Sequence, residues 1–264
     1  TILTDEDIRL SGARTIPDLL RRVPGMDVMS LSYSEYDVAV RGFNRRLANK
    51  ILVLIDGVTA YQDFLGNTLW RALPITLQDI ARIEVVRGPG SAIYGAYAYT
   101  GIVNIILKRP DEIRGTTAEN GAGNGDRLED SFQYGDTKGP VGYRISGGYD
   151  RGDKYDLEFG PDRVDYVSAG DDPNLSLEMA RVNGEIEYNE PDSSLRLYAG
   201  GSVASGRNEL FGVASLRNLT AQATQYRAHA GVSSDLVSVR AAYYHLDADA
   251  APQFFRRGTD TLQS

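Results

Sequence analysis

The sequence has no cysteine, and this absence excludes both a disulfide framework and a thiolate metal site. Histidine is nearly as scarce, because only His229 and His245 occur and neither has a partner at H-x-x-H or H-E-x-x-H spacing. Long apolar runs are missing as well. The longest, at 51–55 and 102–107, are the length of a strand and fall short of the ~18 residues that a membrane helix needs.

A signal peptide is also missing, because residues 1–10 have neither a basic start nor an apolar stretch. We therefore expect either a cytosolic protein or a processed or shortened form. The net charge of −8 and the pI near 4.9 argue against a nucleic-acid partner. Residues 1–110 carry 13 basic and 11 acidic side chains, which leaves 15 of the 28 basic and 25 of the 36 acidic ones to the remainder. This imbalance predicts two regions of different character.

Catalytic motifs are missing too. A phosphate-binding loop needs Lys and Ser or Thr after its last glycine, but Ala96 and Tyr97 follow Gly95 here, and Pro89 removes an N–H from the loop. The dinucleotide fingerprint fails because its third glycine is replaced by Ile93. No G-x-S-x-G sequence occurs. The sequence thus predicts no enzyme and no cofactor.

Residues 1–110 show helix and strand signals in alternation. Thr4 with Asp7 forms a capping-box pattern, and Thr15 can cap a second helix over 16–23 that Pro24 stops. Thr76 to Asp79 predicts a further helix start. Asp56 and Gly57 predict the two-residue turn of a hairpin over 50–61. Strands are expected in the segments MDVMS, DVAVRGF, RIEVVR and GIVNIILK. This region is predicted to be a small mixed α/β domain.

From Arg114 onward the helix signals vanish and apolar and polar residues alternate with period two. The segment 141–150, for example, places Tyr143 and Ile145 on one face and Arg144 and Ser146 on the other. We expect about seven strands, near 115–122, 127–136, 141–151, 176–189, 194–206, 223–233 and 237–248.

The connections between these strands also alternate. Tight turns at 136–140, 189–193 and 233–237 lie between long polar stretches at 152–175 and 207–222. This habit is typical of outer-membrane barrels, although a soluble antiparallel sheet with one wet face gives the same alternation. An odd, unclosed set of strands cannot close a membrane barrel. We therefore expect the chain to be a fragment of a longer protein.

Charged residues at strand ends add a further indication. Arg41 and Arg87 each end a strand and suggest a wet, polar partner surface, whereas the turn alone accounts for Asp56.

Taken in order, the segments LLRRVPGMDV, VAVRGF, ILVLIDGV and LPITLQDIARIEVVRGPGSAIYGAYAYTGIVNIILK resemble the plug domain of TonB-dependent outer-membrane receptors. The resemblance covers residues 3–109. It implies an α+β plug domain at 1–110, followed at 111–264 by antiparallel β-strands of an incomplete transmembrane β-barrel. The family's full barrel has about 22 strands around a plugged lumen.

The resemblance also implies roles for single residues. Arg41 and Arg87 match plug arginines that face acidic residues of the barrel wall in this family. The glycine loop becomes a structural crossover that binds no phosphate, and the plug motif residues are Asp56, Gly57, Gly88, Pro89, Gly90 and Gly95. Tyr97 departs from the family, which usually has a small polar residue there, and Tyr99 lies two residues further on.

By resemblance, the protein is expected to be a receptor of the bacterial outer membrane. It would take up a scarce ligand, with a ferric siderophore first and cobalamin, haem or oligosaccharide as alternatives. Expected partners are outer-membrane lipid, a small-molecule ligand, and TonB with its inner-membrane energy-coupling complex. The segment that contacts TonB is expected upstream of residue 1. A receptor that mainly signals would need an extra N-terminal domain.

Aromatic plug loops are the predicted ligand-binding residues, because aromatic faces with a few polar groups suit large amphipathic ligands. These residues are Tyr33, Tyr36, Tyr61, Asp63 and Phe64. The competing hypothesis is a secreted soluble protein that joins an α/β domain to a β-sheet glycan-binding module.

Overall fold

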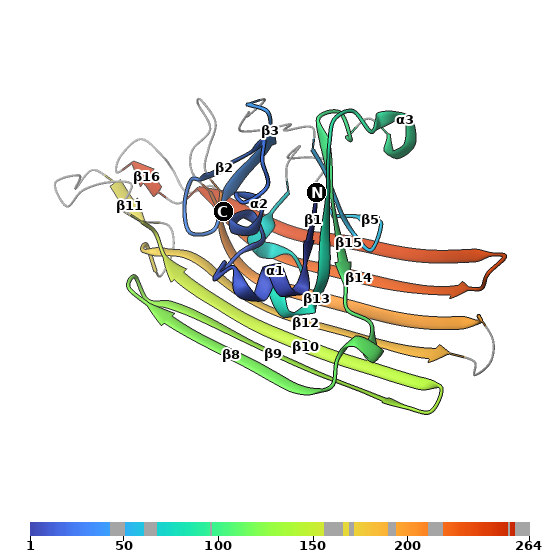
Figure 1. Ribbon diagram of the computed structural model, residues 1–264. Helices are drawn as coiled ribbons and strands as arrows, with labels where there is room; N and C mark the ends of the chain where they lie inside the picture. The colour runs from blue at the N-terminus through green and yellow to red at the C-terminus, as the bar shows by residue number, and fades with distance from the viewer. Residues whose placement is uncertain are drawn as a thin grey trace.

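The computed structural model describes residues 1–42, 51–60, 68–95, 97–155, 166–168, 172–189, 194–210, 219–252 and 254–256. A small mixed α/β domain lies on the concave side of a curved antiparallel sheet (Figure 1). We call the first part the plug and the curved sheet the wall. No helix in the described ranges is long and apolar enough to cross a membrane.

The plug contains short helices and strands in alternation. Its elements are β1 (Ile2–Thr4), α1 (Asp5–Leu10), α2 (Ile16–Leu20), β2 (Met26–Ser30), β3 (Tyr36–Val40), β4 (Ile51–Ile55), β5 (Val58–Thr59), the 3-10 helices η1 (Trp70–Ala72) and η2 (Leu77–Asp79), β6 (Ile80–Arg87), α3 (Ser91–Tyr94), β7 (Gly101–Leu107) and η3 (Pro110–Glu112).

The wall consists of long strands. They are β8 (Gly115–Gly123), β9 (Arg127–Lys138), β10 (Val141–Asp153), β12 (Leu175–Asn189), β13 (Arg196–Leu210), β14 (Leu219–Ser233) and β15 (Ser238–Pro252). Each pairs antiparallel with its neighbour, in the order β15-β14-β13-β12-β10-β9-β8. A separate pair joins β11 (Tyr166–Ser168) to β16 (Phe254–Arg256).

Local sequence signals explain the plug helices. The capping box predicted at Thr4 is confirmed, because its hydroxyl accepts from the Asp7 N–H at 3.2 Å while the Asp7 carboxylate accepts from the Thr4 N–H at 2.9 Å. Thr15 caps α2 in the predicted way. That helix ends at Leu20 rather than at residue 23, because the N–H groups of Arg22 and Val23 turn back to carbonyls only three residues earlier. The helix start predicted at Thr76 is a capped 3-10 helix.

The predicted hairpin turn is also confirmed. Asp56 and Gly57 have φ of 49° and 76°, and Ile55 lies opposite Val58 across the turn. The glycine segment differs from its prediction. It connects β6 to β7, which are adjacent and antiparallel, so it is a hairpin loop and not a crossover. Gly101, at the start of β7, leaves no room for a side chain, because a Cβ there would lie 2.8 Å from the Val86 carbonyl oxygen.

The plug core lies around a five-stranded sheet in the order β1-β6-β7-β4-β5, in which only β4 and β7 run parallel. Helices α1 and α2 contribute apolar side chains to it, and the β2–β3 hairpin supplies Val38 and Val40. The fully buried members include Leu20, Val53, Ile80, Ile83, Val103 and Ile105. By the coefficient of about 25 cal/mol per Å² of apolar surface, burial of this cluster is the main stabilising contribution to the plug.

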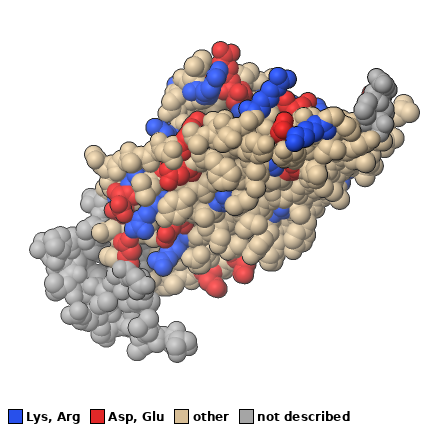
Figure 2. Space-filling model, turned by 90° about the horizontal axis from the view of Figure 1, so that it is seen from below, with Lys and Arg blue, Asp and Glu red and all other residues tan. Residues whose placement is uncertain are grey.

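The two faces of the wall differ sharply in chemistry. Polar side chains point toward the plug and are buried there, including Gln133, Arg144, Asn183, Glu187, Gln225 and Arg227. Apolar side chains point away and are exposed, including Phe132, Ile145, Val182, Ile186, Val203 and Tyr226. Figure 2 shows this outer face, whose middle is largely free of charged residues. The period-two alternation of the sequence therefore encodes a polar-in, apolar-out sheet.

Candidate functional site

The candidate functional site is the contact between plug and wall, and a buried arginine lies at its centre. Arg71 belongs to η1 and its side chain is only 5% exposed. Both terminal nitrogens donate to the Glu129 carboxylate on β9 at 3.5 Å. The Asp150 carboxylate on β10 lies 3.9 Å from the same guanidinium. One plug cation is thus held by two wall carboxylates.

A wall arginine completes this group from the other side. The Arg181 Nη2 of β12 lies 2.6 Å from the Asp150 carboxylate. The same nitrogen donates to the Arg71 backbone carbonyl at 3.0 Å, and Nη1 donates to the Ile75 carbonyl at 3.4 Å. The four side chains Arg71, Glu129, Asp150 and Arg181 form what we call the central network. It balances two cations against two anions across the interface.

Electrostatics keep Arg71 charged although it is buried. Burial of the guanidinium acts to lower its pKa, but the Asp150 carboxylate and further negative neighbours raise it, and the net shift is upward. A buried charge with its partners in place is tolerated, whereas removal of one partner leaves an uncompensated charge. The network therefore makes the docked position of the plug specific.

Tyr33 extends the network. Its hydroxyl donates to Glu129 at 3.0 Å, and the Arg71 guanidinium lies over its ring at 4.4 Å from the centroid. Burial raises the pKa of the Tyr33 hydroxyl above its ordinary value, and Glu129 and Asp150 add to that rise against the opposing effect of Arg71. The ring also packs in an apolar cluster that joins Leu69 and Ala72 of the plug to Leu177, Met179 and Ala204 of the wall.

The raised pKa of Tyr33 predicts an alkaline limit to the docked state. Because the folded protein holds this proton to higher pH than the unfolded chain, the contribution is complete below about pH 10 and is lost as the pH rises through the raised pKa. We expect Tyr33→Phe to reduce stability by about 0.5–1.5 kcal/mol at neutral pH and to remove part of the alkaline decline. Thermal unfolding between neutral and alkaline pH measures both effects. Tyr94→Phe, at a half-exposed tyrosine, is the control, and an identical alkaline decline in both variants would contradict the assignment.

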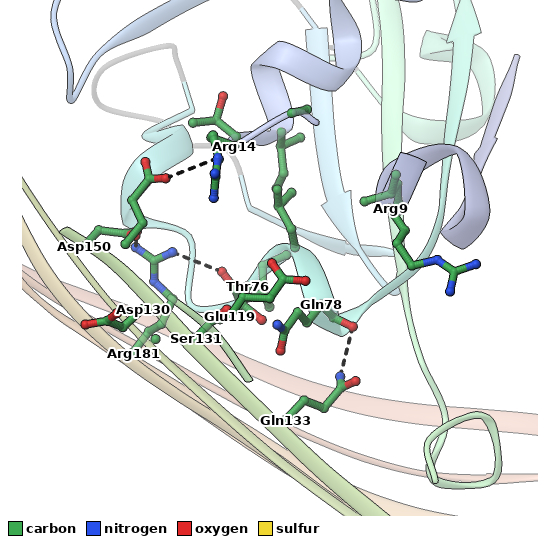
Figure 3. Close-up of a pocket in the computed structure, with 18 of the residues that line it drawn as sticks. Arg9, Arg14, Thr76, Gln78, Glu119, Asp130, Ser131, Gln133, Asp150 and Arg181 are labelled. Atoms are coloured by element: carbon green, nitrogen blue, oxygen red, sulfur yellow. Dashed lines mark hydrogen bonds and ion pairs between the residues drawn. The ribbon is translucent and has the colours of Figure 1, made fainter. Parts of the chain in front are cut away.

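A second contact lies at η2, just before β6. Gln133 of β9 donates to the Gln78 carbonyl at 3.0 Å (Figure 3). Thr76 caps η2 through Asp79, and it approaches the wall so closely that a Cβ at position 148 would lie 2.9 Å from its Cγ2. With Thr76 in place, a side chain at position 148 would press on it, so glycine allows the close packing of plug against wall.

A pocket of 460 Å³ lies beside these contacts, and both plug and wall line it (Figure 3). Most of its lining is charged or polar, including Arg9, Arg14, Gln78, Glu119, Asp130 and Arg181. When plug and wall separate, their charged groups become hydrated again. Separation of an interface of this composition therefore requires less free energy than separation of an apolar core of equal area. The arrangement suits a plug that is held firmly and can still be displaced.

The plug turn at Asp56 is a third contact. The Asp56 carboxylate accepts from the Leu107 N–H at 2.9 Å and from Arg227 of β14 at 3.3 Å. Arg240 of β15 donates to the Asp56 carbonyl. Asp56 is thus more than a turn residue, because it also fastens the hairpin to two wall strands. Nearby, Glu185 of β12 lies 3.0 Å from the His229 ring nitrogen.

The residues predicted from the sequence fall in several places. Tyr33 and Tyr36 are 4% and 6% exposed; Tyr33 packs against wall residues, whereas Tyr36 lies in the plug core. Tyr61, Asp63 and Phe64 lie outside the described residues. Ligand contact by these five residues stays a prediction.

The two predicted plug arginines are exposed. Arg41 follows β3 with φ of 54°, and Arg87 donates to the Pro24 carbonyl within the plug. Their contact with the barrel stays a prediction. Gly88, Pro89, Gly90 and Gly95 all lie in the β6–β7 hairpin loop, where Gly88 and Gly95 have φ of 141° and 85°.

Sequence reasoning missed the central network. Its wall half carries a signal, because polar residues recur at every second position of strands whose other face is apolar, as Arg181, Asn183 and Glu185 do in β12. Arg71 carries none, since its segment TLWRALP shows no pattern. Among the described residues, no group of three or more His, Asp or Glu side chains is placed to hold a metal ion.

Comparisons with known proteins agree with this geometry. The family model "TonB-dependent Receptor Plug Domain" matches residues 1–102. The vitamin B12 transporter BtuB of Vibrio vulnificus (strain CMCP6) is 29% identical over 161 residues, covering 60% of this chain and 26% of that protein. BtuB of Photobacterium profundum is 38% identical over 127 residues, covering 47% of this chain and 20% of the relative.

A solved structure shares the fold of nearly the whole chain. The ferric yersiniabactin uptake receptor FyuA from Yersinia pestis superposes with a TM-score of 0.70 at 14% identity, covering 95% of this chain and 41% of that one. The chain thus spans about a quarter of the curated relatives it matches and about two fifths of this structure.

Fold and interface together define a plug domain seated against antiparallel strands of a receptor barrel. Residues 1–102 match the plug domain of TonB-dependent receptors, and nearly the whole chain shares the fold of part of a solved uptake receptor. This agreement favours a receptor over the secreted glycan-binding protein.

Proposed function

We propose that the protein serves TonB-dependent uptake of a small-molecule ligand across the outer membrane. The observation that carries this proposal is the largely polar plug–wall interface, in which the central network and a 460 Å³ polar pocket lie between the plug core and the wall. A plug that only sealed the barrel would gain more stability from a dry apolar contact. Energy from TonB would displace the plug, and the ligand would pass without any covalent change.

The predicted residue roles belong to this proposal. Arg41 and Arg87 would face barrel carboxylates, and Tyr61, Asp63 and Phe64 would contact the ligand. Tyr33 is buried against the wall and Tyr36 in the plug core, so either would reach a ligand only after a rearrangement that exposes it.

A ferric siderophore is the first candidate cargo, and the fold shared with a ferric yersiniabactin receptor is compatible with it. Cobalamin is the second candidate, and a specific observation favours it. The curated relatives that match this chain at 29% and 38% identity are vitamin B12 transporters. Both ligands are large and amphipathic, which suits an aromatic binding surface.

Uptake measurements separate these candidates. Cells that lack the gene, and the same cells with the gene restored, would be given radiolabelled cyanocobalamin, a ferric catecholate or a ferric hydroxamate. Gene-dependent accumulation of one ligand identifies the cargo class. Protein abundance in outer membranes from iron-starved and iron-replete cells supports the result, because a rise on starvation points to an iron complex. No gene-dependent uptake of any of the three would contradict both candidates.

The apolar outer face of the wall is proposed to contact membrane lipid. Val203 lies on this face at the middle of β13 and is 40% exposed. We expect Val203→Arg to destabilise the folded barrel by about 2–4 kcal/mol, since a charge would meet hydrocarbon. Val203→Leu is the control. Urea unfolding of the receptor in lipid vesicles gives the difference, and equal midpoints for both variants would place this face outside the bilayer.

A further inference from the structure

A second pocket, of 470 Å³, lies between the plug and the wall near the Asp56 turn. It is lined on the plug side by the β4–β5 turn and by residues of β6 and β7. Strands β12 to β15 line it on the wall side, close to the short turn that joins β14 to β15. Short turns face the periplasm in barrels of this kind. The pocket therefore lies near the end of the wall from which a cargo would leave.

Basic side chains dominate this lining, with six Lys or Arg against three Asp or Glu. Four of the six are neutralised by carboxylates. Arg82 lies 2.8 Å from Glu84, and Lys108 lies 2.7 Å from Asp5. The remaining two of these four share Glu187, which lies 3.3 Å from Arg109 and 2.5 Å from Arg196. Among the described residues, the other two, Arg227 and Arg240, have one carboxylate in ion-pair contact between them, that of Asp56, so the surplus of positive charge resides in this pair.

Arg227 is the more unusual of these two. Its side chain is 2% exposed, and its Nη2 donates to the Ile55 carbonyl at 3.1 Å and to the Asp56 carboxylate at 3.3 Å. Its Nε and Nη1 are buried and have no hydrogen-bond partner among the described residues. A buried guanidinium normally uses its donors, because each unmade hydrogen bond to a charged group costs free energy. Two N–H donors of Arg227 thus lack an acceptor among the described residues.

Arg240, on the adjacent strand β15, reaches the same place. Its Nε donates to the Tyr198 hydroxyl at 3.0 Å, and its Nη1 donates to the Asp56 carbonyl. Both partners of Arg240 are uncharged. Within the described part of the chain, the Asp56 carboxylate is the one anion in direct contact with this pair of guanidinium groups, and it contacts Arg227. That carboxylate is also engaged by the Leu107 N–H. The ring of His229 lines the same pocket, and its buried Nδ1 has no partner among the described residues.

We propose that this pocket is a binding site for an oxyanion, the carboxylate or phosphate group of a small molecule, with Arg227 and Arg240 as its principal donors. Guanidinium groups present planar sets of N–H donors that match carboxylate and phosphate oxygens. An oxyanion here would satisfy the free donors of Arg227 and balance Arg240. The site does not depend on which cargo the receptor carries, and it would hold anionic groups between plug and wall.

Direct binding tests this site. The receptor in detergent would be titrated calorimetrically with inorganic phosphate and, in a separate series, with citrate. Saturable binding of either one is the expected result, and the stronger of the two identifies phosphate or carboxylate chemistry. We expect Arg227→Gln to weaken binding about tenfold or more, because a charge-assisted contact is lost. Arg82→Gln, in the same lining but paired with Glu84, is the matched control and should leave affinity nearly unchanged.

Arg240→Gln provides a second variant, because this side chain is exposed and its loss endangers the fold less than that of Arg227. It should also weaken binding. The proposal is overturned if neither anion binds at concentrations up to about 10 mM. It is equally overturned if the Arg82 variant weakens binding as much as the Arg240 variant does. Neither result bears on uptake, which is measured separately in cells.

Discussion

A disulfide between positions 76 and 148 is expected to abolish uptake, and a reductant is expected to restore it. Thr76 belongs to the plug and Gly148 to strand β10 of the wall. A Cβ at position 148 would lie 2.9 Å from the Thr76 Cγ2, so Thr76→Cys and Gly148→Cys would bring two sulfur atoms within bonding reach. The 264 residues contain no cysteine that could compete for pairing. The bond would hold the plug against the wall.

The matched control is a disulfide that leaves the plug free. Ser205 of β13 and Thr224 of β14 face each other with their hydroxyl oxygens 2.8 Å apart. Ser205→Cys with Thr224→Cys would link two wall strands only, and uptake should persist under oxidising conditions. Gel mobility without reductant measures how completely each bond forms. Full uptake with a completely formed 76–148 bond would show that the plug does not need to move at this point.

Replacement of Arg71 is expected to have the largest effect on stability. Arg71→Met would leave the partly buried Glu129 carboxylate with Tyr33 and with Arg14 at 4.0 Å, and would leave Asp150 with Arg181 alone. Loss of one member of a buried ion network costs about 3–5 kcal/mol, since the remaining charge is desolvated without compensation. Urea titration of the receptor in detergent, with proteolysis of the plug as readout, gives the shift of the midpoint.

Two further variants make this result specific. Arg21→Met removes a surface ion pair with Asp18 at 3.4 Å and should change stability by less than about 1 kcal/mol. Arg71→Met combined with Glu129→Gln removes both charges and should recover part of the loss. If Arg71→Met and Arg21→Met cost the same, the central network does not hold the plug.

Much of the fold could be predicted because its signals are local. The Thr4 capping box involves residues three apart, and the Asp56–Gly57 turn needs only two residues with positive φ. The wall strands were recognisable because one face of the sheet meets the plug and the other faces away, so polar and apolar residues alternate along each strand. The glycine segment 88–95 connects two strands as predicted, but as a hairpin loop and not a crossover, because sequence alone does not reveal whether consecutive strands are adjacent.

The site could not be predicted to the same degree. Its contacts join residues far apart in sequence, such as Arg71 with Asp150 and Asp56 with Arg227. The pairing depends on the position of the plug against the wall, which no local pattern encodes. Strand β12 shows the difficulty within one element, since Leu177 and Met179 point inward together with the polar Asn183 and Glu187. The alternation of polar and apolar residues identifies the two faces of the sheet. It does not reveal the apolar surface of the plug that Leu177 contacts.

The most direct test of the account is ligand accumulation in energised cells with and without TonB. The proposed receptor should concentrate its cargo inside cells that carry TonB, and a protonophore or deletion of TonB should abolish accumulation while surface binding persists. Such a result matches a plug held by a displaceable polar network. Accumulation that continues unchanged without TonB would contradict the account, because the plug would then open without the energy that its buried contacts require.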